Sequence, residues 1–147
     1  MTFNRKIAVL TLALTGATLA LAQDSLSLLS GAWRMISLES GTKVGNLQEV
    51  PYSGEIVFTE AGTMSVQAMN PDADAAPTPY TMNGYEAFYG SLDVDEEAKT
   101  FVVTVDSALV RDLIGQDLER AFEVSENQLI LTPTSPDEFW RVTYERQ

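Results

Sequence analysis

Arg120 is the best candidate in this sequence for a functional side chain, because it places a permanent positive charge among apolar residues. Polarity alternates along this segment, and alternate side chains of a strand point to opposite faces. Arg120 is in phase with the apolar residues Leu118, Phe122 and Val124, whereas the residues out of phase are mostly acidic. The pattern predicts that Arg120 points into the core, where a charge must be paired or must bind something.

Glu86 is the best predicted partner for that charge. It is in phase with Phe88, Leu92 and Val94, which places it on the buried face of its own strand. One interpretation is an internal salt bridge between Glu86 and Arg120 that fixes the register of the strands. The other interpretation is that Arg120 anchors a carboxylate, phenolate or enolate group of a ligand, and that the apolar body of this ligand lies against the apolar side chains of the protein interior.

Catalytic chemistry has few candidate groups here, because the sequence contains neither histidine nor cysteine. Their absence excludes Ser-His-Asp and Cys-His nucleophiles and metal sites built from imidazole or thiolate. No phosphate-binding glycine loop or dinucleotide fingerprint is present, and the carboxylates of residues 93–97 are expected in a solvated turn. The sequence therefore leads us to predict no metal, no cofactor and no catalytic residue.

One enzymatic alternative stays open. Glu86 would act as a base whose pKa is raised by burial, and Arg120 or a tyrosine would stabilise an oxyanion, in a cofactor-free isomerase, cyclase or lyase. Direct contact with Arg120 would lower the pKa of Glu86 and weaken the base. The salt bridge and this mechanism therefore conflict.

Eight short segments of alternating polarity would position these groups. They are residues 33–38, 56–59, 64–68, 85–94, 99–106, 118–124, 128–132 and 138–145. Short strands joined mostly by tight reversals predict an all-β, eight-stranded antiparallel up-and-down barrel, since closing the sheet removes its free edges. The interior of such a barrel is either filled by side chains or holds one small ligand.

Three segments interrupt the regular alternation. Residues 39–54 are polar and are expected to form a long loop, and the proline-rich residues 70–79 an exposed loop of the kind that acts as a lid. Residues 107–115 carry four apolar side chains at helical spacing. That spacing predicts a short helical segment over one barrel end, either as a plug or as a lid.

Residues 1–22 are expected to be a signal peptide, followed by a barrel domain over residues 23–147. Arg5 and Lys6 precede an apolar run shorter than the roughly 18 residues of a membrane span, and Ala-Leu-Ala at residues 20–22 is a cleavage signal. The mature chain is then exported, to the periplasm or outside the cell, without disulfides or a cysteine-linked lipid.

The net negative charge of the chain argues against some classes of binding partner. The sequence has nine basic and 21 acidic residues, and without Arg5 and Lys6 seven basic residues remain, a net charge of −14. Such a surface repels phosphate backbones and anionic headgroups, which argues against nucleic acid and against membrane docking of the mature chain. The acidity is expected to serve solubility.

Several blocks of the sequence together resemble the bacterial lipocalin-like domain family. They are Gly31-x-Trp33, Tyr85–Asp95, Gly115, Arg120-Ala121-Phe122-Glu123-Val124, Leu129-Ile130-Leu131-Thr132 and Trp140-Arg141. The resemblance covers nearly all of residues 23–147 and implies a calycin-type barrel that binds a small apolar or amphipathic molecule. It also implies that Gly31 and Trp33 close one barrel end, with Arg141, or else Arg146, stacked on the indole.

The resulting prediction is an exported barrel that binds or carries a small hydrophobic or amphipathic molecule. The candidate ligand-binding residues are Arg120, Glu86, Phe88, Tyr89, Phe58, Met64, Phe122 and Tyr144. Two alternatives remain: the enzyme described above, and an interaction module of the cell envelope with a filled core and no ligand. A cavity that exposes Arg120 or Glu86 would favour binding or catalysis, whereas a solid core would favour the interaction module.

Overall fold

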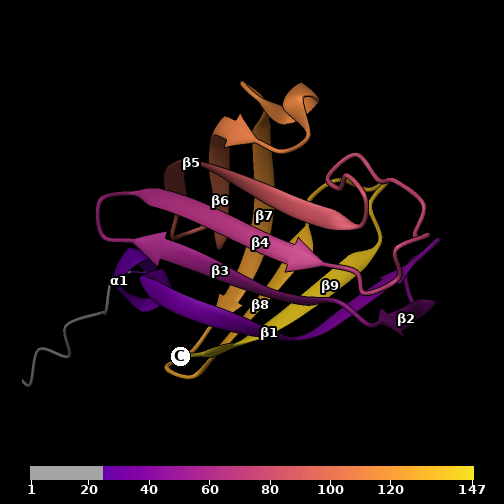
Figure 1. The fold of residues 1–147 in the computed structure, drawn as a ribbon. Helices are drawn as coiled ribbons and strands as arrows, with labels where there is room; N and C mark the ends of the chain where they lie inside the picture. The colour runs from indigo at the N-terminus through magenta and orange to yellow at the C-terminus, as the bar shows by residue number, and fades with distance from the viewer. Residues whose placement is uncertain (1–24) are drawn as a thin grey trace, which may run out of the picture.

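The computed structural model describes residues 25–147, so the predicted signal peptide lies outside the described residues. Strands dominate this part of the chain, with one short helix and one 3-10 turn (Figure 1). In chain order the elements are α1 (Ser25–Leu29), β1 (Gly31–Gly41), β2 (Leu47–Val50), β3 (Ser53–Thr59), β4 (Thr63–Met69), β5 (Tyr85–Asp95), β6 (Thr100–Ala108), the 3-10 turn η1 (Arg111–Leu113), β7 (Asp117–Val124), β8 (Gln128–Pro133) and β9 (Trp140–Arg146).

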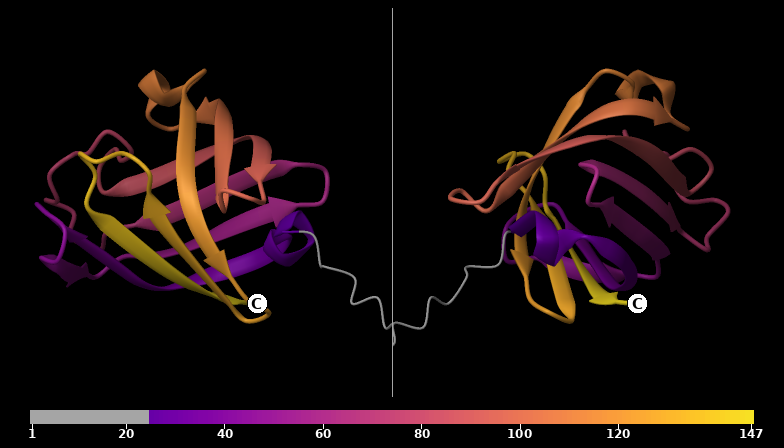
Figure 2. Two further views of the ribbon diagram at one scale, coloured as in Figure 1. Left: turned by 180° about the vertical axis from the view of Figure 1, so that it is seen from behind. Right: turned by 90° about the vertical axis from the view of Figure 1, so that its left-hand side faces the viewer.

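Eight of the strands form a closed barrel. β1 and β3 to β9 pair in chain order, each antiparallel to the next, and β9 returns to pair with β1. The closing seam runs from Trp33 opposite Arg146 to Ser40 opposite Trp140. Figure 2 shows the sheet curving round so that its last strand lies beside its first. The predicted all-β, eight-stranded antiparallel barrel is confirmed.

Residues 39–54 differ from the predicted loop. β1 continues to Gly41 and pairs there with β2, Leu38 opposite Val50 and Gly41 opposite Leu47. Two of the four residues of β2 are exposed and none is buried. β2 therefore has no buried face, and no alternation of polarity marks it in the sequence. Gly41 allows the tight turn, because a Cβ there would lie 2.2 Å from the backbone oxygen of Asn46.

The short helical segment predicted at residues 107–115 is present as a single turn. A 3-10 turn forms only over Arg111–Leu113. Leu113 is buried and Val110 packs partly against the core, whereas Leu109 and Ile114 are exposed. The apolar spacing in this segment therefore reflects one turn that Leu113 fastens to the barrel.

A bulge in β6, where Asp106 has no partner on β5, helps the sheet to close. The pairing of β5 with β6 shifts between Tyr89 and Gly90. A Cβ on Gly90 would lie 2.0 Å from the carbonyl oxygen of Thr104, so only glycine fits there. Bulges bend a strand and increase its twist, which barrel closure requires. The extra residue lies in β6, so the alternation along β5 is unbroken and the side chains of Glu86 and Phe88 point inward as predicted.

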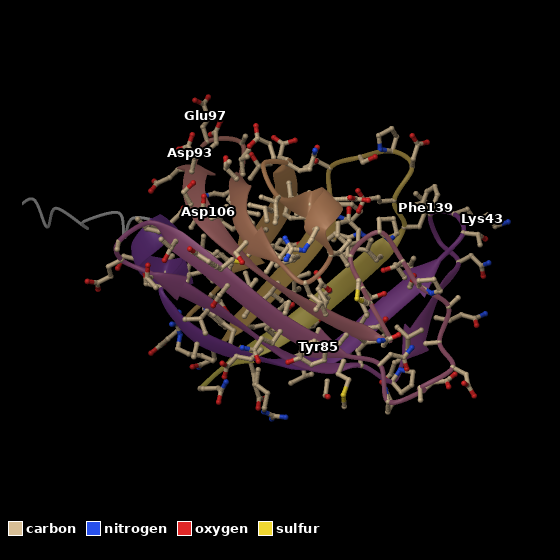
Figure 3. The ribbon with its side chains drawn as sticks, turned by 45° about the horizontal axis from the view of Figure 1, so that its top comes forward. Lys43, Tyr85, Asp93, Glu97, Asp106 and Phe139 are labelled. Carbon is tan, nitrogen blue, oxygen red and sulfur yellow. The ribbon has the colours of Figure 1, made fainter. Side chains whose placement is uncertain are left out.

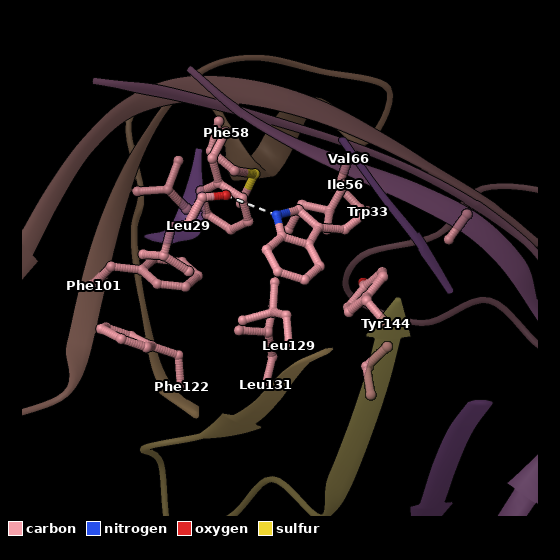
Figure 4. Close-up of a cluster of buried hydrophobic side chains, with 14 of the residues drawn as sticks. Leu29, Trp33, Ile56, Phe58, Val66, Phe101, Phe122, Leu129, Leu131 and Tyr144 are labelled. Atoms are coloured by element: carbon pink, nitrogen blue, oxygen red, sulfur yellow. Dashed lines mark hydrogen bonds between the residues drawn. The ribbon is translucent and has the colours of Figure 1, made fainter. Parts of the chain in front are cut away.

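One end of the barrel is solid. Phe58 and Phe101 meet edge to face with ring centroids 5.5 Å apart, and Phe101 stacks on Phe122 at 6.2 Å. Trp33 and Leu29 are completely buried in the same core. The indole Nε1 of Trp33 donates a hydrogen bond of 2.7 Å to the carbonyl of Leu29 (Figure 4). α1 thus seals this end through its last residue.

Arg146 covers Trp33, so the choice of Arg141 for this role is wrong. The guanidinium carbon of Arg146 lies 4.0 Å from the indole ring centroid. Its nitrogens donate hydrogen bonds to the carbonyl oxygens of Leu28, Ser30 and Glu126. The reason is register: Arg146 lies directly opposite Trp33, whereas Arg141 is exposed and out of phase with its buried neighbours on β9.

Gly31 makes room for this arrangement. Its φ of 127° is one that side chains rarely adopt, and a Cβ there would lie 2.9 Å from Nη1 of Arg146. α1 is also tied down at its start, where the backbone nitrogen of Ser25 donates to Glu96 and its hydroxyl accepts from Lys99. The closed end is therefore a structural unit rather than a binding surface.

Candidate functional site

The opposite half of the barrel is hollow. A cavity of about 740 Å³ reaches from the buried side chains of Phe101 and Leu131 to the loop of residues 70–84. Much of its wall is apolar and includes Met35, Ile56, Met64, Val66, Phe88 and Val142. Polar groups interrupt this wall in two sets, Glu86 with Tyr144 and a cluster around Arg120, and the loop of residues 70–84 adds others at the mouth, such as Asp72 and Thr78.

Glu86 points into the cavity from β5. It lies opposite Ala68 of β4, which lines the same cavity. Within residues 25–147 the Glu86 carboxylate has no hydrogen-bond or ion-pair partner. Burial raises the pKa of Glu86 from 4.5 to about 7, against a smaller lowering by the positive charge of Arg120. The carboxylate is therefore available to a molecule in the cavity.

Tyr144 of β9 lines the same cavity and is 3% exposed. Burial raises the pKa of its phenol, and the negative charge of Glu86 raises it further. Tyr144 is therefore protonated at physiological pH, and its hydroxyl can both donate and accept a hydrogen bond. Together, Glu86 and Tyr144 give the cavity a polar spot surrounded by apolar side chains.

The guanidinium of Arg120 is held in a mouth cluster, formed by Tyr80, Arg120, Glu138 and Trp140. Its carbon lies 5.4 Å from the ring centroid of Tyr80 and 5.1 Å from that of Trp140. Glu138 accepts hydrogen bonds from the Tyr80 hydroxyl at 3.1 Å and from Nε1 of Trp140 at 2.8 Å. Nη1 of Arg120 donates to the carbonyl of Glu119 at 2.8 Å. All four side chains of the cluster line the cavity.

The predicted salt bridge between Glu86 and Arg120 is wrong. Among the described residues, the carboxylate that pairs with Arg120 is that of Glu138, with 4.0 Å between Nη2 and Oε2. Arg120 does point inward, as the alternation predicts, and only 13% of its side chain is exposed. Residues 138–145 were predicted as one strand, but β9 begins only at Trp140, and Glu138 lies in the irregular segment before it. Glu86 alone was predicted as the partner of Arg120, so the role of Glu138 was missed.

The loop of residues 70–84 forms one side of the cavity mouth. Ala75, Ala76 and Thr78 are among its residues that line the cavity. The loop is closed at its base by a hydrogen bond from the backbone nitrogen of Asn70 to the carbonyl of Gly84 at 2.8 Å. Tyr80 connects it to the mouth cluster. The loop therefore belongs to the wall of the site, which the sequence indicates only through its proline content and its position between strands.

The other candidate ligand-binding residues are divided between cavity, core and surface. Phe88 and Met64 line the cavity, as expected. Phe58 and Phe122 belong instead to the solid end. Tyr89 is a correction: it is 49% exposed and lies outside the cavity lining, because it is out of phase with its neighbour Phe88.

The acidic turn between β5 and β6 lies apart from the cavity, and Asp93 and Glu97 stand at the edge of the molecule (Figure 3). Asp95 accepts hydrogen bonds from the backbone nitrogens of Glu97 and Ala98, which is the geometry of a turn. Over residues 25–147 no group of three or more acidic side chains is arranged to hold a metal ion. No helix in that range has the length and apolar character of a membrane span.

A barrel with one sealed end, one hollow end and a tryptophan under an arginine defines a calycin-type binding module. A family model described as a lipocalin-like domain matches residues 30–145, and the chain belongs to that family. The resemblance inferred from the sequence blocks is thereby confirmed. A comparison with curated proteins found no matching relative.

Proposed function

We propose that this protein binds a small hydrophobic or amphipathic molecule inside its barrel. The observation that carries the proposal is the cavity of about 740 Å³ with an apolar wall and few polar groups. Ligand sites for small molecules typically enclose about 300 to 1,000 Å³ and combine such a wall with a few polar groups that fix orientation. The strands of a closed barrel would hold that wall in place before the ligand arrives.

The packing of the barrel interior argues against the alternative of an interaction module whose core is filled by side chains. Phe58, Phe101 and Phe122 fill only the end next to α1. The half that contains Glu86 and Arg120 is not filled by side chains. An apolar cavity of this size lowers the stability of a domain, because its lining loses packing contacts, and binding a ligand would restore them.

A neutral fluorescent probe, N-phenyl-1-naphthylamine, provides the direct test. We expect it to bind the wild-type protein and to be displaced by long-chain alcohols. Ala68→Phe and Val66→Phe place a ring in the cavity and should weaken probe binding at least about ten-fold. Ala87→Phe adds the same ring next to Glu86 but on the outer face of β5, and should bind like the wild type. Equal affinity in all four proteins would show that the probe binds elsewhere.

We also propose that the protein is exported. The support is the pattern of residues 1–22, in which a basic start, an apolar run and a small-residue cleavage signal follow one another. Cell fractionation followed by mass spectrometry of the intact chain tests this proposal. The expected result is a chain that begins at Gln23 in the periplasm or medium. An uncleaved chain in the cytosol would contradict it.

A second candidate function is cofactor-free proton transfer. It is favoured by one observation: the Glu86 carboxylate faces the cavity with a pKa raised to about 7, close to the value suited to a general base at neutral pH. The conflict noted above does not arise, since Arg120 pairs with Glu138 instead. The base would remove a proton from a carbon next to a carbonyl, while the Tyr144 hydroxyl donates to the carbonyl oxygen.

Exchange of α-protons with solvent tests this candidate. An apolar cyclic ketone in D₂O should exchange its α-protons faster with the wild type than with Glu86→Gln. The matched change at exposed Glu123, Glu123→Gln, should leave the rate unchanged. Equal rates with the wild type and Glu86→Gln would exclude Glu86 as the base and leave the binding function as proposed.

A further inference from the structure

Negative groups outnumber positive ones around the cavity. Its lining contains four carboxylates, those of Asp72, Glu86, Asp137 and Glu138, and a single cationic side chain, Arg120. The whole chain has a net charge of −12, so the field outside the mouth has the same sign. This charge distribution favours a cationic ligand over an anionic one.

Arg120 is poorly placed to anchor an anion. Its charge is opposed by Glu138, its face is covered by the rings of Tyr80 and Trp140, and Nη1 already donates to the carbonyl of Glu119. A ligand carboxylate would have to compete with Glu138 and lie close to its negative charge. The mouth cluster therefore acts against an anionic ligand, which was one of the two interpretations of Arg120 drawn from the sequence.

Glu86 is placed in the opposite way. Its carboxylate faces the cavity from β5, and no group of residues 25–147 donates a hydrogen bond to it or pairs with it. An ionised carboxylate can only accept hydrogen bonds, so a ligand group beside it must be a donor. A buried charge without a partner is costly, and a ligand cation would remove that cost.

We propose that the ligand of this barrel is a hydrophobic amine whose ammonium group pairs with the Glu86 carboxylate and whose apolar body lies against the cavity wall. The inference rests on the binding function proposed above and specifies its ligand class. The Tyr144 hydroxyl accepts a second hydrogen bond from the ammonium, and the aromatic face of Phe88 on the same wall is attractive to a cation.

Three ligands with one chain length test the inference: decylamine, 1-decanol and decanoate, titrated at pH 8 by displacement of N-phenyl-1-naphthylamine. At this pH the amine is protonated, because alkylammonium groups resemble lysine with a pKa of about 10.4. We expect the wild type to bind decylamine roughly ten-fold or more tightly than decanol, since hydrogen bonds to charged groups are the stronger ones. Decanoate should bind most weakly of the three.

Two substitutions assign the preference to Glu86. Glu86→Gln keeps the shape but removes the charge, and should bring decylamine and decanol to within about three-fold of each other. Glu86→Leu should give the same result while retaining decanol binding, so the test does not depend on one variant. The control Glu123→Gln removes a charge from the outer face of β7 and should keep the ten-fold preference.

The outcomes distinguish this inference from the function on which it rests. Equal binding of decylamine and decanol by the wild type, or a preference for decanoate, would overturn the amine inference while supporting binding in the barrel. An amine preference that survives both Glu86 variants would also overturn it. If none of the three ligands binds and the ring in Ala68→Phe has no effect on the probe, the binding function fails as well.

Discussion

The carboxyl group of Glu86 holds its proton more tightly in the folded chain than in the unfolded one, because burial raises its pKa from 4.5 to about 7. Between these two values the folded state binds more protons, so this group makes the protein less stable as the pH rises. The penalty is absent below pH 4.5 and complete above pH 7, where it is on the order of 3 kcal/mol from the size of the shift.

Glu86→Gln should therefore be more stable than the wild type at pH 8, by up to about 3 kcal/mol, and the difference should shrink toward pH 4.5. Urea unfolding of both proteins at pH 4.5, 6 and 8 measures the free energies of unfolding. Other carboxylates titrate in both proteins and cancel in the difference. A difference that stays constant with pH would contradict the raised pKa of Glu86.

Arg146 should contribute far more to stability than Arg141, although the two belong to the same strand. Arg146→Met removes the cation from Trp33 and leaves the carbonyls of Leu28 and Ser30 without donors, which should cost about 2 to 4 kcal/mol. Arg141→Met changes an exposed side chain and should stay within about 0.5 kcal/mol of the wild type. Equal losses in chemical denaturation would count against the closed end as described.

Single residues were predictable where a strand alternates and unpredictable where it does not. The inward directions of Arg120 and Glu86 follow from period-two polarity. The pairing of Arg120 with Glu138 does not, because Glu138 lies outside the regular strands and meets Arg120 only through the fold. Likewise, the choice between Arg141 and Arg146 depends on the register of β9 against β1, which no local pattern specifies.

Among the elements, the loop of residues 70–84 is the one expected to control access to the cavity. The hydroxyl of Tyr80 joins it to Glu138 of the mouth cluster. Tyr80→Phe keeps the ring over Arg120 but loses this hydrogen bond, which should lower stability by about 0.5 to 1.5 kcal/mol and loosen the loop. Amide hydrogen exchange over residues 75–82 should then become faster.

Tyr85→Phe is the matched control, because its hydroxyl bonds to Gln67 in an exposed position. It should leave exchange in residues 75–82 unchanged. If both variants exchange at the wild-type rate, the contact between Tyr80 and Glu138 does not fasten the loop.

The strands themselves were largely predictable, since each barrel strand has one buried and one exposed face. β2 was missed for the complementary reason: it has no buried face. The short helical segment was predictable from its apolar residues at helical spacing, which form one 3-10 turn held by Leu113. Alternating polarity in the sequence therefore indicates that one face of a strand is buried, and a strand without a buried face gives no such pattern.

At the scale of the whole molecule, the barrel is asymmetric along its length. The rings of Phe58, Phe101 and Phe122 and the helix α1 fill one end, and the cavity occupies the other. Closure and family were predictable from the ordered strands and sequence blocks. The cavity was not, because it depends on the summed volumes of side chains from strands distant in the chain, such as Ala68, Phe88 and Tyr144.

Native mass spectrometry of the protein, purified from its own host without detergent, shows whether the hollow half of the barrel holds a small molecule. We expect one small molecule per chain in the wild type, released on denaturation and greatly reduced in Ala68→Phe but not in Ala87→Phe. Wild-type protein that carries no such molecule and forms no complex with added decylamine or decanol would contradict the proposed binding function.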